Sequence, residues 1–249
     1  KTFASLEMVL SAMDRLEVRG RDSAGVHLMV PGEVGSADRS LQIRLEEPLF
    51  RSGAIRTTGE ESLSFVYKTA AEVGELGDNG ARLRRSIKED EVLRNLFATS
   101  ENRGDEGDAS IPVVLGHTRW ASVGLINEAN AHPLNQEETG SGERAPFVVA
   151  VLNGDVDNYR TLASREGLEL PVEITTDAKV IPALIARRLR EGMPLEDAFL
   201  QTVASFSGSV AIAAQSAAEP DKLLLALHGS GQALYVGFME DGFIVASEP

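Results

Sequence analysis

Residues 116–122 have the sequence Gly-His-Thr-Arg-Trp-Ala-Ser, and Asn-Ala-His-Pro follows closely at residues 130–133. The first stretch begins directly after an apolar run, Val-Val-Leu at residues 113–115. Continuous apolar runs are typical of strands that are covered on both faces. The run therefore predicts a buried strand that carries Arg119 to its end, and we interpret residues 116–122 as a loop that binds an amino acid.

Arg119 and Asp177 are charged residues with a candidate role in binding, and each allows a second interpretation. An arginine in a loop is commonly a solvated charge or part of a structural ion pair, but its planar guanidinium also suits a bidentate clamp on a carboxylate. Asp177 ends the segment Thr-Thr-Asp. It fits either the N-cap of a helix or a partner for a ligand ammonium. His117 and His132 fit hydrogen-bonded structural residues better than general bases.

Asn153 and Gly154 directly follow a second apolar run, residues 147–152. Asn-Gly is a favoured pair in a type I′ turn, so a tight turn is one interpretation. The other is an oxyanion hole, in which the Asn amide and the Gly N–H donate to a developing negative oxygen. Residues 19–25, Arg-Gly-Arg-Asp-Ser-Ala-Gly, form a helix-to-strand connection whose small residues allow close backbone packing.

Hydrophobic periodicity predicts the helices and strands. Helices are expected over residues 3–18, 81–96, 177–189 and 195–204. Strands are expected over residues 26–30, 41–45, 64–68, 113–115 and 147–152, and a C-terminal strand meander over 209–214, 222–227, 233–238 and 243–246. Residues 78–80, Asp-Asn-Gly, are typical of a turn, and we expect a mobile loop at 99–110.

The composition is that of a globular protein with one large domain or two small ones. The 249 residues carry a net charge of -14, which argues against nucleic-acid and anionic-membrane partners. No apolar run is long enough to span a bilayer, and from the residues at the start of the sequence we expect no secretory signal. The chain has no cysteine, which excludes disulfides and cysteine-ligated metals and fits a cytoplasmic protein. Its four histidines lack metal-ligand spacing, so we expect neither a metal nor a cofactor.

Taken in chain order, these motifs resemble the glutaminase domain of class II, N-terminal-nucleophile glutamine amidotransferases. The pair His-Thr-Arg-Trp and Asn-Ala-His-Pro favours the branch of the glutamine:fructose-6-phosphate amidotransferases (glucosamine-6-phosphate synthases) and their sugar-isomerase-domain relatives. The resemblance implies an α+β fold, a four-layer αββα sandwich of the N-terminal-nucleophile hydrolase type with two antiparallel sheets between helical layers. It covers residues 1–249 as a single glutaminase-like domain.

The resemblance also implies how glutamine is bound. Arg119 and Ser122 would hold its α-carboxylate, Asp177 its α-ammonium, and Trp120 would lie on the loop that closes over the site. No metal takes part.

The chemistry that the resemblance implies is hydrolysis of glutamine to glutamate and ammonia. Asn153 and Gly154 would form the oxyanion hole, and Arg19 and Gly20 would lie beside the nucleophile. That nucleophile is an N-terminal cysteine, whose own α-amino group serves as the base. The ammonia would travel to a C-terminal sugar-isomerase-type acceptor domain in the parent chain, for amino-sugar synthesis.

The sequence departs from the family pattern in several places. It opens at Lys1 almost on the first helix, so we expect the first, nucleophile-bearing strand to be absent, and the acceptor domain as well. Leu152 and Val123 occupy positions where the family commonly has histidine. The segment of about 33–110 is longer than in typical members, which predicts an insertion whose role is open. The acceptor substrate and the oligomeric state, a homo-oligomer included, are also open.

Four hypotheses compete. The chain is part of a working amidotransferase, in which case the parent is an enzyme and these residues alone are inactive. It is instead a catalytically dead glutamine-binding or regulatory pseudoenzyme domain, as the departures at Leu152 and Val123 would allow. A third option is a hydrolase with Thr2 as nucleophile, which Lys1 argues against because the base must be the nucleophile's own amine. The fourth is a scaffold domain without a ligand. We prefer the first, because the carboxylate clamp, the ammonium partner and the oxyanion hole are retained together.

Overall fold

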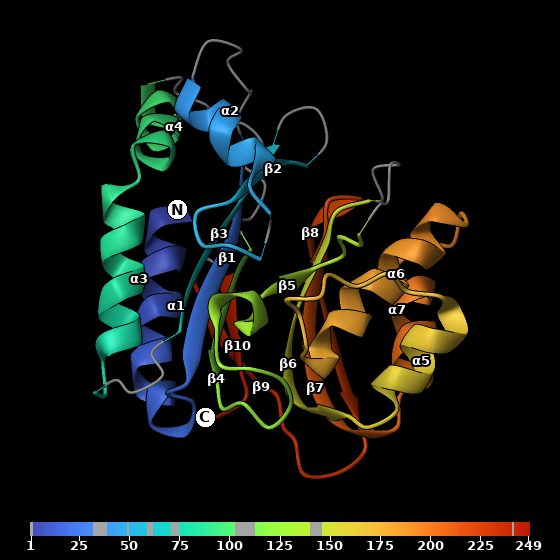
Figure 1. Cartoon of the computed structure of the whole chain (residues 1–249). Helices are drawn as coiled ribbons and strands as arrows, with labels where there is room; N and C mark the ends of the chain where they lie inside the picture. Colours follow the sequence, from blue (N-terminus) through green and yellow to red (C-terminus); the bar gives the residue numbers. More distant parts are fainter. Residues whose placement is uncertain are drawn as a thin grey trace.

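Two four-stranded antiparallel sheets lie at the centre of the molecule, and helices cover the outer face of each (Figure 1). The computed structural model describes residues 2–31, 39–48, 50–58, 62–70, 75–102, 113–139, 146–240 and 242–249. The arrangement is a four-layer αββα sandwich, which confirms the α+β fold that the resemblance predicted.

The first sheet has the strand order β2-β3-β1-β4. Its strands are β1 (Ser23–Pro31), β2 (Ile55–Thr57), β3 (Ser62–Ala70) and β4 (Val114–Arg119). β1 is a central strand that pairs with β3 on one side and with β4 on the other. In this register Gly25 lies between Lys68 and His117, so one row of residues crosses the sheet.

Four helices form the layer over the first sheet: α1 (Thr2–Leu16), α2 (Arg39–Glu46), α3 (Asp78–Glu89) and α4 (Glu91–Asn102). α1 is amphipathic, and its buried face carries Leu6 and Leu10 one helical turn apart. α3 buries Leu83 and Ile87 in the same way. Removing each such side chain from water contributes about 1.5–3 kcal/mol to the free energy of folding.

The second sheet has the strand order β5-β6-β7-β8. Its strands are β5 (Leu134–Asn135), β6 (Val148–Val156), β7 (Gly208–Ser216) and β8 (Glu219–His228), and its helices are α5 (Tyr159–Glu166), α6 (Val180–Arg190) and α7 (Leu195–Ala204). Pro182 falls in the first turn of α6, where a missing backbone N–H leaves no hydrogen bond unmade. The chain also forms three short 3₁₀ turns: η1 (Glu17–Arg19), η2 (Glu128–Asn130) and η3 (Asp177–Lys179).

Each interface between layers has its own hydrophobic core. One core joins the first sheet to its helices, and another joins the second sheet to α5, α6 and α7. A smaller core lies between the two sheets, around Met29, Val66, Leu115, Phe147 and Val149. The two sheets therefore meet through apolar side chains over only part of their facing surfaces.

The C-terminal strands β9 (Tyr235–Met239) and β10 (Gly242–Ala246) form a separate two-stranded sheet. The four strands of the predicted C-terminal meander all exist, but β7 and β8 belong to the second sheet, so the prediction of one continuous meander is wrong. No helix of the described ranges is long and apolar enough to cross a membrane.

Other local predictions also need correction. Residues 41–45, predicted as a strand, belong to helix α2. The predicted helix 81–96 is two helices that meet at Asp90, and the turn predicted at 78–80 is the first turn of α3. α4 extends to Asn102, and most of the loop predicted at 99–110 lies outside the described residues.

Candidate functional site

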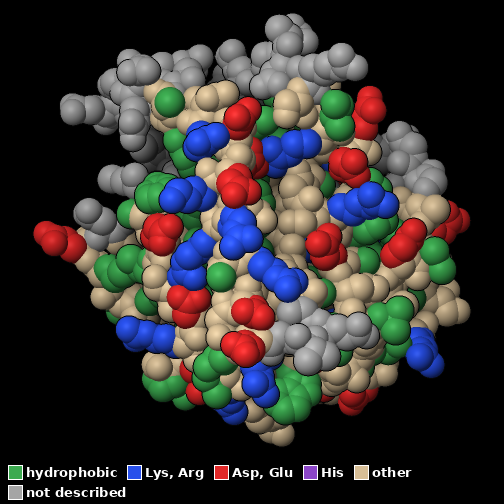
Figure 2. Space-filling view, turned by 60° about the vertical axis from the view of Figure 1, so that its left-hand side comes forward, with side chains coloured by type: hydrophobic (Ala, Val, Ile, Leu, Met, Phe, Trp, Pro, Cys, Tyr) green, Lys and Arg blue, Asp and Glu red, His purple; other side chains and the backbone are tan. Residues whose placement is uncertain are grey.

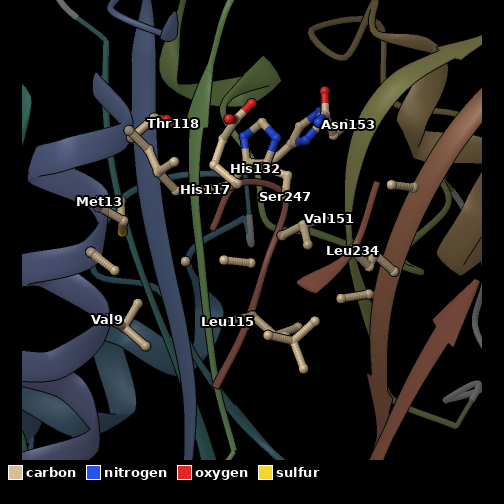
Figure 3. Close-up of a pocket in the computed structure, with 18 of the residues that line it drawn as sticks. Val9, Met13, Leu115, His117, Thr118, His132, Val151, Asn153, Leu234 and Ser247 are labelled. Carbon is tan, nitrogen blue, oxygen red and sulfur yellow. The ribbon is translucent and has the colours of Figure 1, made fainter. Parts of the chain in front are cut away.

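A cavity of about 1210 Å³ opens between β4, β6, α1 and the β9–β10 hairpin. All predicted site residues except Gly20 line it: Arg19, Arg119, Trp120, Ser122, Asn153, Gly154 and Asp177. Figure 3 shows its two ends, with Val9, Met13, Leu115 and Val151 at the apolar end and His117, His132 and Asn153 at the polar end. A largely apolar cavity with a few convergent polar groups is the usual form of a small-molecule site.

Arg119 is the last residue of β4 and is only 4% exposed. Its guanidinium donates to the backbone carbonyls of Val123 and Leu125, which fastens the loop that follows the strand. Burial lowers the pKa of Arg119, while the neighbouring carboxylates of Asp177 and Asp22 act to raise it. The guanidinium has five N–H donors, so after two carbonyl bonds it still has donors for a ligand carboxylate.

The loop after Arg119 carries the next two predicted residues. Trp120 is 74% exposed and lies at the mouth of the cavity. The hydroxyl of Ser122 donates to a carboxylate oxygen of Asp155 at 2.5 Å, and the backbone N–H of Ala121 donates to Asp22 at 2.8 Å. The sequence did not single out Asp22 or Asp155, because a lone aspartate carries no signal of its own and the partners of both lie far away along the chain.

Asp177 is buried at the start of η3. Its carboxylate accepts hydrogen bonds from the backbone N–H of Val156 at 2.7 Å and from the hydroxyl of Thr176 at 3.2 Å. The alternative interpretation of Asp177 as an N-cap is wrong, because Thr176 holds the N-cap position and the carboxylate bonds to β6. Burial raises the pKa of Asp177, and the nearby charge of Asp155 adds to the increase.

Asn153 and Gly154 lie inside β6, opposite Ala211 and Val210 of β7, so the type I′ turn is not present. Gly154 has a φ of 111°, a left-handed conformation that favours glycine, and a Cβ there would collide with the backbone oxygen of Ser209. The Asn153 side chain is exposed and lies at the polar end of the cavity (Figure 3).

Residues 19–25 support the other strands of the site. Arg19 ends η1 and forms an ion pair with Glu248, and both residues line the cavity. Gly20 does not line the cavity, but a Cβ on it would lie 2.7 Å from the backbone oxygen of Thr118. Gly25 likewise leaves room for the backbone oxygen of His132. Residues 19–25 therefore pack closely against both residues 116–122 and residues 130–133.

His117 and His132 form a buried pair, with ring centroids 4.4 Å apart and planes tilted by 39°. The Nδ1 atom of His132 accepts a hydrogen bond from the backbone N–H of Leu152 at 3.4 Å, directly before Asn153. Burial lowers the pKa of His117 to about 4 and that of His132 well below its ordinary value. Both rings are therefore neutral at pH 7, which agrees with the structural role predicted for them.

Asn130 is fully buried and fixes the segment before Asp177. Its Oδ1 accepts from the backbone N–H groups of Thr175 and Thr176 at 2.7 and 2.9 Å, and its Nδ2 donates to the carbonyl of Glu173 at 3.2 Å. This role of the Asn-Ala-His-Pro stretch was not predicted, because it depends on contacts more than 40 residues away along the chain.

The described ranges contain no group of three or more His, Asp or Glu side chains placed to hold a metal ion.

Comparisons with known proteins give one consistent result. No protein-family model matches the chain. It is similar to the glutamine–fructose-6-phosphate aminotransferase (isomerizing) of Shouchella clausii, at 28% identity over 97% of this chain and 30% of that protein. The protein of the same name from Staphylococcus epidermidis is 30% identical over 76% of this chain and 29% of its own length. The chain therefore spans about three tenths of the curated relatives it matches.

A solved structure, the allosteric regulatory enzyme of purine biosynthesis, matches the fold with a TM-score of 0.53. It is 17% identical, and the match covers 97% of this chain and 39% of that one. Together with the aminotransferase relatives, this places the chain among the N-terminal-nucleophile glutamine amidotransferases, as a homologue of the glutamine–fructose-6-phosphate aminotransferases.

Proposed function

We propose that the cavity between the sheets binds L-glutamine, and that the parent protein hydrolyses the side-chain amide to glutamate and ammonia. The observation that carries the proposal is the meeting of opposite charges with polar donors in one cavity. Arg119 and Asp177 are a buried cation and a buried carboxyl, and Asn153 and Gly154 line the same space. An α-amino acid carries the complementary pair of charges on one carbon atom.

Each group has a role in this proposal. Arg119 and the Ser122 hydroxyl bind the α-carboxylate, Asp177 binds the α-ammonium, and Trp120 covers the mouth. The Asn153 amide and the Gly154 N–H stabilise the oxyanion that forms when the side-chain amide is attacked. Donors of this kind contribute about 3–4 kcal/mol each to lowering the barrier in measured systems.

The rest of the reaction lies with the parent protein. Its curated relatives are more than three times as long as the matched segment and are named for fructose 6-phosphate. We therefore propose a sugar-isomerase-type acceptor domain in the parent, transfer of the ammonia to a sugar phosphate, and a place in amino-sugar synthesis. The absence of cysteine from these 249 residues favours the cytoplasm and means that the attacking thiol would come from outside them.

A second candidate function is glutamine binding without hydrolysis. The observation that favours it is again the lack of any cysteine, together with Leu152 and Val123 at positions where the family commonly has histidine. This candidate keeps the roles of Arg119 and Asp177 and gives no catalytic role to Asn153.

The test is an assay of glutamate release by the full-length native protein, with intact mass spectrometry of its N-terminus and calorimetric titration with L-glutamine. An N-terminal cysteine with glutamate release would support the first candidate. Saturable glutamine binding without glutamate release would support the second. Absence of binding would overturn both, and D-glutamine serves as the control for specific recognition.

A further inference from the structure

The charges that line the large cavity are less balanced than those on the outer surface. On the face shown in Figure 2, Lys and Arg side chains are interspersed with Asp and Glu. The cavity lining has Arg19 and Arg119 as its cations, against Asp155, Asp177, Glu240 and Glu248. Arg19 is already paired with Glu248. At the polar end this leaves Arg119 with two carboxyl groups, those of Asp155 and Asp177, of which the proposed function uses only the second.

Asp155 lies on β6, two residues after Asn153, and both residues line the cavity. It is partly buried, and its carboxylate accepts the hydroxyl of Ser122 at 2.5 Å. It is also close enough to Asp177 for its charge to act on that carboxyl group. Asp155 therefore lies between the residue proposed for the α-carboxylate, Ser122, and the residue proposed for the α-ammonium, Asp177.

The hydrogen bond from Ser122 to Asp155 competes with the proposed role of Ser122. A hydroxyl group carries one proton, so it donates either to Asp155 or to the α-carboxylate of the ligand. When the ligand takes this proton, Asp155 loses the donor that satisfies it here, which is costly for a partly buried carboxylate. An amino acid carries its carboxylate and its ammonium on one carbon atom. The carboxylate that takes the proton of Ser122 therefore brings an ammonium group toward Asp155.

An ammonium group has more donors than Asp177 needs. The carboxylate of Asp177 already accepts from the backbone N–H of Val156 and from the hydroxyl of Thr176. An ammonium group has three N–H donors, so it can donate to Asp177 and to Asp155 at the same time. Two neighbouring carboxylates repel each other when both are charged, and a cation shared between them offsets that repulsion.

Building on the glutamine site proposed above, we propose that Asp155 is a second carboxylate of the α-ammonium site. In this arrangement the Ser122 hydroxyl turns from Asp155 to the ligand carboxylate, and the ligand ammonium takes its place beside Asp155 and Asp177. Asp155 thereby makes the site selective for ligands with a free α-ammonium over ligands that lack one.

The test is calorimetric titration of the full-length protein with L-glutamine and with 4-carbamoylbutanoate, which is glutamine without its α-ammonium. Asp155→Asn removes the charge but keeps an oxygen that can accept from Ser122. Loss of one charged hydrogen bond should weaken glutamine binding about tenfold and should not weaken binding of 4-carbamoylbutanoate. Asp157→Asn, which is exposed and outside the cavity lining, is the matched control and should change neither affinity.

The pH dependence of glutamine binding gives an independent readout. Burial raises the pKa of Asp177, and the charge of Asp155 adds to the increase. The cation that faces Asp177 is Arg119 of β4, and the nearby His117 and His132 are neutral. Asp155→Asn removes one cause of the increase, so glutamine affinity should persist to a lower pH than in the wild type. A decrease at the same pH in both proteins would contradict a shared ammonium site.

A purely structural role for Asp155, as the acceptor that holds Ser122, gives a different result. Asp155→Asn would then bind both ligands as the wild type does, whereas Asp155→Ala, which removes the acceptor, would weaken both alike. That result would overturn the inference and leave the glutamine site intact. Absence of glutamine binding by the wild-type protein would overturn the proposed function, and the role of Asp155 with it.

Discussion

Gly154 shows how closely a single residue is constrained in the candidate site. Its φ of 111° and the collision that a Cβ would make with Ser209 both require glycine. Gly154→Ala should therefore lower the free energy of unfolding by more than about 2 kcal/mol, measured by urea denaturation. Gly192→Ala is the matched control, because Gly192 has a φ of 87° but no atom near its added Cβ. Equal losses for the two variants would show that backbone strain, and not the collision, explains the effect.

Asp177 tests the proposed recognition of glutamine at the same scale. Asp177→Asn keeps an oxygen for the N–H of Val156 but removes the charge opposite the ligand ammonium. Glutamine affinity, measured by calorimetry, should fall by a factor of about 10–100, since charged hydrogen bonds contribute roughly 1.5–3 kcal/mol. Asp197→Asn, exposed on α7, is the control. An unchanged affinity in Asp177→Asn would refute the ammonium role.

The pH dependence of glutamine binding follows from the same carboxyl group. The folded-state pKa of Asp177 is raised, so its charged form is lost at a higher pH than for an ordinary aspartate. Wild-type affinity should therefore decrease as the pH falls through that raised pKa, whereas Asp177→Asn should show no such decrease. Titrations at pH 7 and pH 5 provide the measurement.

At the scale of elements, the buried stretch 130–133 fixes the position of a segment that is distant in the sequence, residues 175–177. Asn130 holds the backbone before Asp177 through hydrogen bonds at Thr175 and Thr176. Asn130→Ala removes the acceptor of both N–H groups, and the buried N–H of Thr176 is left unpaired at a cost of about 1–3 kcal/mol. We expect lower stability, faster amide exchange at Thr175 and Thr176, and weaker glutamine binding. Unchanged amide exchange would mean that the segment holds its shape without Asn130.

Local sequence predicted most elements but not all their types, and residues 41–45 show why. Leu41, Ile43 and Leu45 alternate with polar residues, which favours a strand. The same five residues place Leu41 and Leu45 one helical turn apart, and in α2 both pack on the first core while Ile43 is 56% exposed. A window of five residues fits both the two-residue repeat of a strand and the 3.6-residue repeat of a helix, so only tertiary packing decides between them.

Asn153 and Gly154 show the same limit for the candidate site. A type I′ turn and this position of β6 both need a positive φ at glycine, so the dipeptide alone could not separate them. The resemblance placed the pair at the site, and the structure brings it to one cavity with Arg119 and Asp177. Asp22, Asp155 and Asn130 could not be predicted, because their partners come from distant segments.

For the whole molecule, buried histidines should make stability sensitive to acid. Burial lowers the pKa of His27 to about 3 and that of His117 to about 4, below the ordinary 6.5. Between these values the unfolded chain binds protons that the folded chain does not, so stability falls as the pH falls below 6.5. Each histidine should cost about 2 kcal/mol at pH 5 relative to pH 7. Urea denaturation at the two pH values checks this, and His27→Gln should reduce the loss. An equal loss in His27→Gln and wild type would assign the effect to other groups.

The division of the apolar interior into three cores has a consequence for how the molecule opens. The core between the sheets is the smallest and borders the large cavity, whereas each sheet has a larger core with its own helices. Parting the sheets therefore exposes less apolar surface than unfolding either half, so it should require less free energy. The two halves should therefore behave as separate foldons. The lowest-energy opening of the molecule should be a separation of the two sheets at the cleft between them.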